Sequence, residues 1–145
     1  MELNEPYLFG NEINYLKECI DKNQLTFGSY IIKFENIVKK YLGIKYAIAT
    51  VNGTAAIHIS LLVAGVKPEE EVFTSTLSFI APANAIRYIG AWPIFVDSES
   101  NQWQMDIDKL NEFIKNHCTW QNGILSNKGK AVIYIYHYSV MVNPS

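Results

Sequence analysis

Residues 51–58 read Val51-Asn52-Gly53-Thr54-Ala55-Ala56-Ile57-His58, and they separate two apolar runs. The run before them, Tyr46–Val51, has the β-rich composition of a short buried strand. The run after them, Ala55–Ala64, is typical of a buried helix that Gly65 would end. A strand that turns through a glycine into a helix leaves backbone N–H groups unpaired at the helix start. Together with the helix dipole, these donors favour an anion, usually a phosphate group.

The pattern around Gly53 is also that of an ordinary connection between a strand and a helix, in which Thr54 only caps the helix. It is not a P-loop because no Gly-Lys-Ser/Thr follows, and the chain holds no G-x-G-x-x-G motif. A phosphate at this turn would therefore be held by backbone donors and by the Thr54 hydroxyl.

Strand-like and helix-like segments alternate from Lys45 onward. The sequence predicts a strand over Glu71–Ser75, a helix from about Phe79 to Tyr88, a strand over Trp92–Val96, a helix capped by Asp106, a polar loop from Asn116 to Lys130 and a final strand over Ala131–Tyr136. This alternation predicts an α/β fold with three layers, in which helices cover both faces of a mostly parallel sheet. Ligands bind such sheets at the carboxyl ends of strands, where we expect the Gly53 turn.

Two amphipathic helices are predicted ahead of this alternation. One follows Asn11, and the other carries apolar residues at three- and four-residue spacing from Ile31 to Leu42 and ends at Gly43. We therefore divide residues 1–145 into N-terminal helices (1–44), an α/β part that carries the Gly53 turn (45–137) and a tail (138–145). The tail follows a strand without a recognisable helix, which we interpret as a sign of truncation.

Composition narrows the classes of function. The 145 residues are 49% hydrophobic and 13% aromatic, which is enough for one packed domain. A net charge of −2 and the lack of a basic stripe give no case for a nucleic-acid partner. Two distant cysteines, no leader peptide and no apolar run near the roughly 20 residues that span a bilayer predict a cytoplasmic protein without a membrane partner.

Other chemistry-bearing residues form no constellation. The histidines and cysteines lack the paired spacing of metal ligands, so no metal site is expected. No serine has a G-x-S-x-G setting and Cys118 has no visible base, which argues against a catalytic nucleophile. Phe79, just after the Glu71–Ser75 strand, is either a face on which a flat heteroaromatic ring stacks or a core aromatic residue.

Several motifs occur in a fixed order along the chain. They are Gly28-Ser29-Tyr30, Phe34-Glu35, Tyr41–Ala47, Asn52–His58, Ser78–Ile86 and Gly90–Asp97. In this order and spacing, nearly from Pro6 to about His137, the chain resembles the N-terminal portion of the DegT/DnrJ/EryC1/StrS aminotransferases. The resemblance implies a pyridoxal 5'-phosphate (PLP) cofactor and the aspartate aminotransferase fold (fold type I). It also implies that residues 1–145 are an incomplete large domain of such a transferase, with 45–137 as its cofactor-binding part and 138–145 as a divergent tail. Most enzymes of this family aminate nucleotide-linked keto-sugars in polysaccharide or deoxyamino-sugar biosynthesis.

The resemblance also implies roles for single residues. Gly53, Thr54 and Ala55 match the family's turn that binds the cofactor phosphate, and Phe79 matches the aromatic residue that stacks on the pyridine ring. Asn84 matches a recurrent family position, to which we assign a supporting role near the cofactor. The family implies glutamate as the amino donor, a nucleotide-sugar substrate and a homodimer whose active sites are completed across the interface.

Two groups that the family's chemistry needs are expected downstream of the matched segment. They are the lysine that forms the Schiff base with the cofactor and the aspartate that keeps the pyridine nitrogen protonated. No lysine here lies in a matching motif, so we expect no catalytic residue in these 145 residues and no transamination by this chain alone. The alternatives are a Rossmann-like domain, which lacks its glycine fingerprint, and a non-catalytic module that binds a phosphate ligand or mediates dimerisation.

Overall fold

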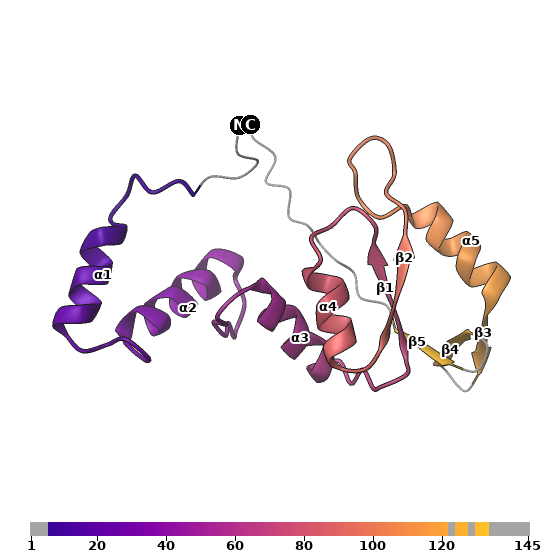
Figure 1. Cartoon of the computed structure of the whole chain (residues 1–145), viewed down its shortest axis with the longest axis horizontal. Helices are drawn as coiled ribbons and strands as arrows, with labels where there is room; N and C mark the ends of the chain where they lie inside the picture. The colour runs from indigo at the N-terminus through magenta and orange to yellow at the C-terminus, as the bar shows by residue number, and fades with distance from the viewer. Residues whose placement is uncertain (1–5, 122–123, 128–129, 134–145) are drawn as a thin grey trace. The chain divides into compact units, whose positions relative to one another are not determined.

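A computed structural model describes residues 6–121, 124–127 and 130–133 of the chain (Figure 1). The chain divides into two compact units, Met1–Ala49 and Thr50–Ser145. The predicted boundaries at residues 44 and 137 stay predictions, and the predicted tail, 138–145, lies outside the described residues.

The first unit holds the two predicted amphipathic helices, α1 (Glu12–Asp21) and α2 (Ser29–Leu42). Gly43 ends α2 in the left-handed conformation, with φ of 66°, as the sequence predicts. Asn11 occupies the N-cap position of α1, but its side chain makes no hydrogen bond to the helix backbone. The Tyr30 hydroxyl donates a hydrogen bond to the Glu18 carboxylate, which links the two helices.

The second unit carries the alternating elements. They are α3 (Gly53–Val63), β1 (Glu71–Ser75), α4 (Ala81–Tyr88), β2 (Trp92–Val96), α5 (Ile107–His117), β3 (Cys118–Gln121), β4 (Ile124–Asn127) and β5 (Lys130–Ile133). The predicted strands at β1 and β2 are confirmed with the same bounds. Pro82 lies in the first turn of α4, where its missing N–H costs no helical hydrogen bond. Asp106 caps α5 by accepting hydrogen bonds from the backbone N–H groups of Asp108 and Lys109.

The strands form one sheet in the order β2-β1-β5-β4-β3. Strand β1 pairs in parallel with β2 and with β5, whereas β4 pairs antiparallel with β3 and β5. The α/β class is thus confirmed, with a parallel centre and an antiparallel hairpin at one edge. Figure 1 shows α4 and α5 on opposite sides of β1 and β2.

Neighbouring residues of β1 point into two separate cores. Val72 packs with Leu61 of α3 and Ile86 of α4. Phe73 packs with Leu110 of α5 on the other side of the sheet. Because successive strand side chains point to opposite faces, this split shows that helices cover both faces of β1. The three-layer arrangement that the sequence predicts is present in this unit.

The predicted strand over Tyr46–Val51 is wrong, because the run is irregular and its large side chains are exposed, with Ile48 83% exposed. A strand needs a neighbour that pairs its backbone groups, and no strand among residues 6–121, 124–127 and 130–133 pairs with this run.

The predicted loop from Asn116 to Lys130 is also wrong, since it contains the β3–β4 hairpin. Leu125 of that hairpin is buried in the same core as Phe73. This apolar contact anchors a segment whose composition is otherwise mostly polar. The last predicted strand begins one residue earlier, at Lys130, and residues 134–136 lie outside the described part. In the part that the structure describes, no helix has the length and apolar character needed to cross a bilayer.

Candidate functional site

The turn before α3 is organised by Asn52. Its backbone is extended, with φ of −163° and ψ of 173°, and its side-chain oxygen accepts a hydrogen bond of 2.9 Å from the N–H of Ala55. Its carbonyl oxygen accepts from the N–H of Ala56 at 3.1 Å and from the Thr50 hydroxyl at 3.0 Å. The cap of α3 is therefore Asn52, and the alternative in which Thr54 caps the helix is wrong.

Gly53 and Thr54 provide the donors that remain. Within the described residues, their backbone N–H groups and the Thr54 hydroxyl have no protein acceptor, whereas the Ala55 N–H is used by the cap. These N–H groups are the first two of an 11-residue helix and lie at the positive end of its dipole. The arrangement fits a phosphate group, which needs several donors and little else.

Gly53 is not required by the fold. It lies in the first turn of a helix, and a Cβ added there would meet no heavy atom of the described residues within 4 Å. Alanine is the better helix former by about 1 kcal/mol, so neither backbone conformation nor packing explains the glycine. The missing Cβ leaves that space open to a ligand that would approach the backbone closely.

Phe79 lies in the connection between β1 and α4, and its side chain is 83% exposed. The alternative that it is a core aromatic residue is therefore wrong. Hydrogen bonds hold the backbone at both ends of this connection: the Thr76 N–H donates to Val96 at 2.9 Å, and Ile80 accepts from the Asn84 N–H at 2.9 Å. The ring is thus presented to the outside by an anchored loop.

Asn84 lies half-buried in α4, between two buried alanines. Its helix packs against α3 through Leu61 and Ile86, and the rings of His58 and Tyr88 meet edge-on with centroids 5.7 Å apart. The structure therefore packs α4, which holds Asn84, against α3, which begins at Gly53. No hydrogen bond or ring contact among the described residues joins the side chains of Phe79 or Asn84 to the Gly53 turn.

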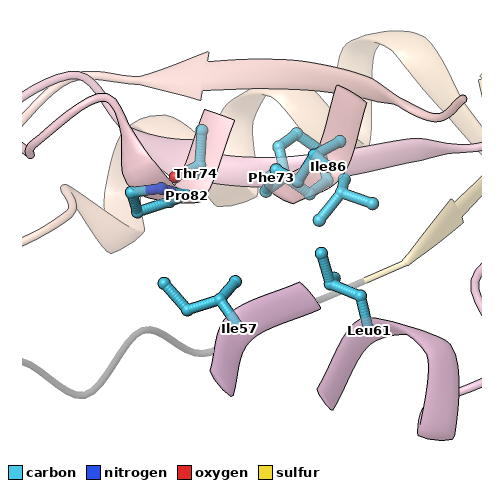
Figure 2. Close-up of a pocket in the computed structure, with 7 residues that line it drawn as sticks. Ile57, Leu61, Phe73, Thr74, Pro82 and Ile86 are labelled. Atoms are coloured by element: carbon cyan, nitrogen blue, oxygen red, sulfur yellow. The ribbon is translucent and has the colours of Figure 1, made fainter. Parts of the chain in front are cut away.

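A pocket lies between α3, β1 and α4, and Figure 2 shows Ile57 and Leu61 of α3 facing the residues of the other two elements. Its lining consists of Ile57, Leu61, Val72, Phe73, Thr74, Pro82 and Ile86. Thr74 is the only polar side chain in this lining, and none is charged. The pocket suits apolar packing, so the candidate phosphate site is the Gly53 turn and not this pocket.

Other groups offer little chemistry. Burial raises the pKa of the Cys118 thiol, and the nearby Glu71 carboxylate adds to the shift, so its reactive thiolate form is disfavoured. Among the described residues, no three His, Cys, Asp or Glu side chains are grouped as metal ligands would be.

Sequence reasoning missed two features of this region. Asn52 has a signal that could have been used, because asparagine before a glycine and a helix is a favoured N-cap. The hydroxyl pair of Ser75 and Ser98, 3.2 Å apart, joins residues 23 positions apart and has no local signal.

Fold and turn together define an α/β domain that has a candidate anion site at a helix start and an exposed aromatic ring in the next connection. The chain belongs to the DegT/DnrJ/EryC1/StrS aminotransferase family, whose sequence pattern matches residues 6–139.

Similar proteins extend this assignment. The chain is 38% identical over 135 residues to a GDP-perosamine synthase of Escherichia coli O157:H7, covering 92% of this chain and 34% of that protein. A family aminotransferase from Brucella abortus superposes with a TM-score of 0.67 at 29% identity, over 73% of this chain and 29% of that one. The NtdA structure from Bacillus subtilis, with bound cofactor PMP, gives 0.64 at 39% identity, over 69% and 23%. The chain thus spans about a third or less of these proteins.

Proposed function

We propose that this chain contributes the phosphate-binding turn and the stacking aromatic ring of a PLP site in a sugar aminotransferase. The N–H groups of Gly53 and Thr54 and the Thr54 hydroxyl bind the phosphate, and Phe79 stacks on the pyridine ring. Ala55 lies in the same turn, but its N–H reaches the phosphate only if Asn52 releases it. Asn84 has a supporting role on the adjacent helix. When bound, PLP supplies the electron-withdrawing ring through which an amino group is transferred.

The observation that carries the proposal is the open space at Gly53. The helix start offers two backbone donors that have no acceptor in the part of the chain that the structure describes, and the residue between the cap and Thr54 has no Cβ to obstruct an approaching phosphate. An ordinary helix start has no need for that glycine. Family membership and a 39% identical relative with bound PMP support PLP as the group that occupies this space.

The proposed reaction belongs to the whole protein. Glutamate gives its amino group to the keto carbon of a nucleotide-linked sugar, which yields 2-oxoglutarate and the amino-sugar nucleotide. The similarity to GDP-perosamine synthases from two bacteria, 38% and 40% identical, supports a nucleotide-linked sugar as the acceptor. We further propose a cytoplasmic homodimer that needs neither nucleic acid nor a membrane.

Binding of PLP to the purified full chain, followed by equilibrium dialysis, tests the site. We expect Gly53→Ala to weaken PLP binding at least tenfold without lowering the unfolding midpoint, because the added Cβ obstructs only the ligand. We expect Thr54→Val to weaken binding by roughly tenfold, the loss expected for one hydrogen bond to a charged group. Ser60→Ala is the matched control, since its hydroxyl lies on the same helix and bonds to the Ala56 carbonyl at 2.8 Å. Equal PLP affinity in all four proteins would refute the proposed site.

A second experiment separates cofactor binding from catalysis. Borohydride treatment of the chain with PLP should leave no stoichiometric adduct on one lysine, because none lies in the family's lysine motif. A stoichiometric adduct would show that the chain has its own covalent attachment point. Release of 2-oxoglutarate from glutamate, with a nucleotide-linked keto-sugar as acceptor, measures transamination and is expected to be absent for this chain alone.

A further inference from the structure

Two serine hydroxyls join the carboxyl ends of neighbouring parallel strands. Ser75 is the last residue of β1, where it is in register with Val96, the last residue of β2. Ser98 follows two positions beyond Val96, and its Oγ lies 3.2 Å from the Oγ of Ser75. Both residues are half-buried. The pair therefore ties the loop that leaves β1 to the loop that leaves β2.

Ser75 also holds the start of the loop that carries Phe79. Its Oγ accepts a hydrogen bond of 3.3 Å from the backbone N–H of Leu77. The N–H of Thr76, between them, donates to the carbonyl of Val96 at 2.9 Å. Two successive backbone donors of the loop are thus fixed to the ends of β1 and β2, two and three positions before Phe79.

Ser98 is a firm anchor because the loop after it is closed on itself. Ser98 pairs with Met105 in an isolated antiparallel bridge. The Glu99 carboxylate accepts hydrogen bonds from the N–H groups of Asn101 at 2.6 Å and Gln102 at 2.5 Å. These bonds lower the pKa of Glu99, so the carboxylate that closes the loop is charged at neutral pH.

Phe79 itself is 83% exposed, so packing does little to set the direction of its ring. Its orientation depends on the backbone that carries it, which is fixed before it through Ser75 and after it where Ile80 accepts from Asn84. Stacking on a flat ring is sensitive to such orientation, since misplacement of a binding group by about 1 Å reduces its effect severely.

We propose that Ser75 and Ser98 are positioning residues that fix the loop presenting Phe79 to the pyridine ring of PLP. This role rests on the proposed function and adds to it that a hydroxyl pair outside the Gly53 turn fixes the loop that carries Phe79. The two serines do not touch the cofactor. They act through the Leu77 N–H and the backbone that leads to Phe79.

A double-mutant cycle on the full chain tests this mechanism, with the dissociation constant of PLP as the readout. We expect Ser75→Ala and Phe79→Leu each to weaken PLP binding by roughly threefold to tenfold, the range of one modest polar or stacking interaction. Ser75→Ala should have no further effect in the Phe79→Leu background, because the residue through which it acts is gone. Ser75→Thr keeps the hydroxyl and should restore binding, and Ser60→Ala is the control for loss of a helical hydroxyl.

A second readout needs no cofactor. Hydrogen exchange at the Leu77 amide should be faster in Ser75→Ala and unchanged in Ser75→Thr, because only the hydroxyl accepts that N–H. If the effects of Ser75→Ala and Phe79→Leu on PLP binding are additive while the wild-type chain binds PLP, this inference is wrong and the proposed function stands. If the wild-type chain does not bind PLP, the proposed function fails and this inference fails with it.

Discussion

The side-chain oxygen of Asn52 accepts a hydrogen bond from the N–H of Ala55 at 2.9 Å, and the preceding N–H groups of Gly53 and Thr54 have no acceptor among the described residues. An N-cap satisfies one of the unpaired donors of a helix, and here the donor it takes is the third. The cap is also neutral, which matters beside a site proposed for a phosphate group, because a charged cap would act on the ligand as well as on the helix.

Substitutions of Asn52 should separate helix capping from anion binding. Asn52→Ala removes the cap and should lower the free energy of unfolding by about 1 kcal/mol. Asn52→Asp caps equally well and suits the helix dipole, so its stability should match the wild type. Its carboxylate would repel a phosphate at the same turn, and PLP binding should weaken by roughly tenfold or more. Urea unfolding and PLP dialysis measure the two effects; an Asn52→Asp variant that binds PLP like the wild type would exclude a phosphate close to this cap.

The packing of α3 on the sheet should depend on one of two adjacent leucines. Leu61 is fully buried against Val72 and Ile86, whereas Leu62 is 53% exposed. Leu61→Ala should lower the free energy of unfolding by about 2–5 kcal/mol, because it removes buried contacts and leaves a cavity. Leu62→Ala keeps the helix-forming tendency and should change stability by about 0.5 kcal/mol at most. Chemical denaturation compares the two, and equal losses would mean that α3 is not packed as described.

Local sequence patterns correctly predicted those elements of the second unit whose ends are marked by nearby residues. The bounds of β1 and β2 follow from short apolar runs ended by glycine or polar residues, and α5 follows from the Asp106 cap. The Tyr46–Val51 run has the same local character but no partner strand in the described residues, so its apolar composition does not produce a strand. Strand formation depends on distant pairing, which a local pattern does not contain.

The β3–β4 hairpin shows the reverse case, because strands form there from a segment whose composition is mostly polar. Polar residues dominate Asn116–Lys130, but Asn122-Gly123 is a favoured two-residue hairpin signal that composition alone conceals. At the candidate site, short motifs and a family resemblance predicted Gly53, Thr54 and Phe79 from the sequence, and these roles stay predictions. The sequence could not show that Ala55 is engaged by Asn52, or that Ser75 meets Ser98, because both depend on side-chain geometry in the folded chain.

Among the glycines that the structure describes in the second unit, Gly90 should be the least replaceable. Its φ is 82°, and a Cβ added there would lie 3.2 Å from the Cβ of Pro68. Gly65 has a similar φ of 84°, but a Cβ added there would meet no described residue within 4 Å. Both Gly90→Ala and Gly65→Ala should cost about 1–2 kcal/mol from the left-handed backbone, and Gly90→Ala should cost more because Pro68 must move. Thermal unfolding of the two variants gives the difference, and a smaller loss for Gly90→Ala would contradict the close contact with Pro68.

The bond between Tyr30 and Glu18 should make the first unit sensitive to alkaline pH. Donation to the Glu18 carboxylate, with burial as a smaller cause, raises the pKa of Tyr30 from 10.0 to about 12. Hydrogen bonds from Lys22 and then from Tyr30 lower the pKa of Glu18 below 4.5. Because the Tyr30 pKa is raised on folding, its contribution to stability is complete below pH 10 and is lost as the pH rises toward 12. Because the Glu18 pKa is lowered, its contribution is complete above pH 4.5 and is lost as the pH falls further.

Tyr30→Phe removes the hydroxyl and should abolish the alkaline part of this profile. The wild type should be more stable than Tyr30→Phe by a constant margin between about pH 6 and pH 9, and the margin should shrink above pH 10 as Tyr30 ionises. Urea unfolding across this range measures the margin, and absorbance titration should show a late-ionising tyrosine in the wild type that Tyr30→Phe lacks. Tyr41→Phe is the control, since Tyr41 is 86% exposed. A stability margin that stays constant to pH 11 would show that the hydrogen bond to Glu18 does not raise the pKa of Tyr30.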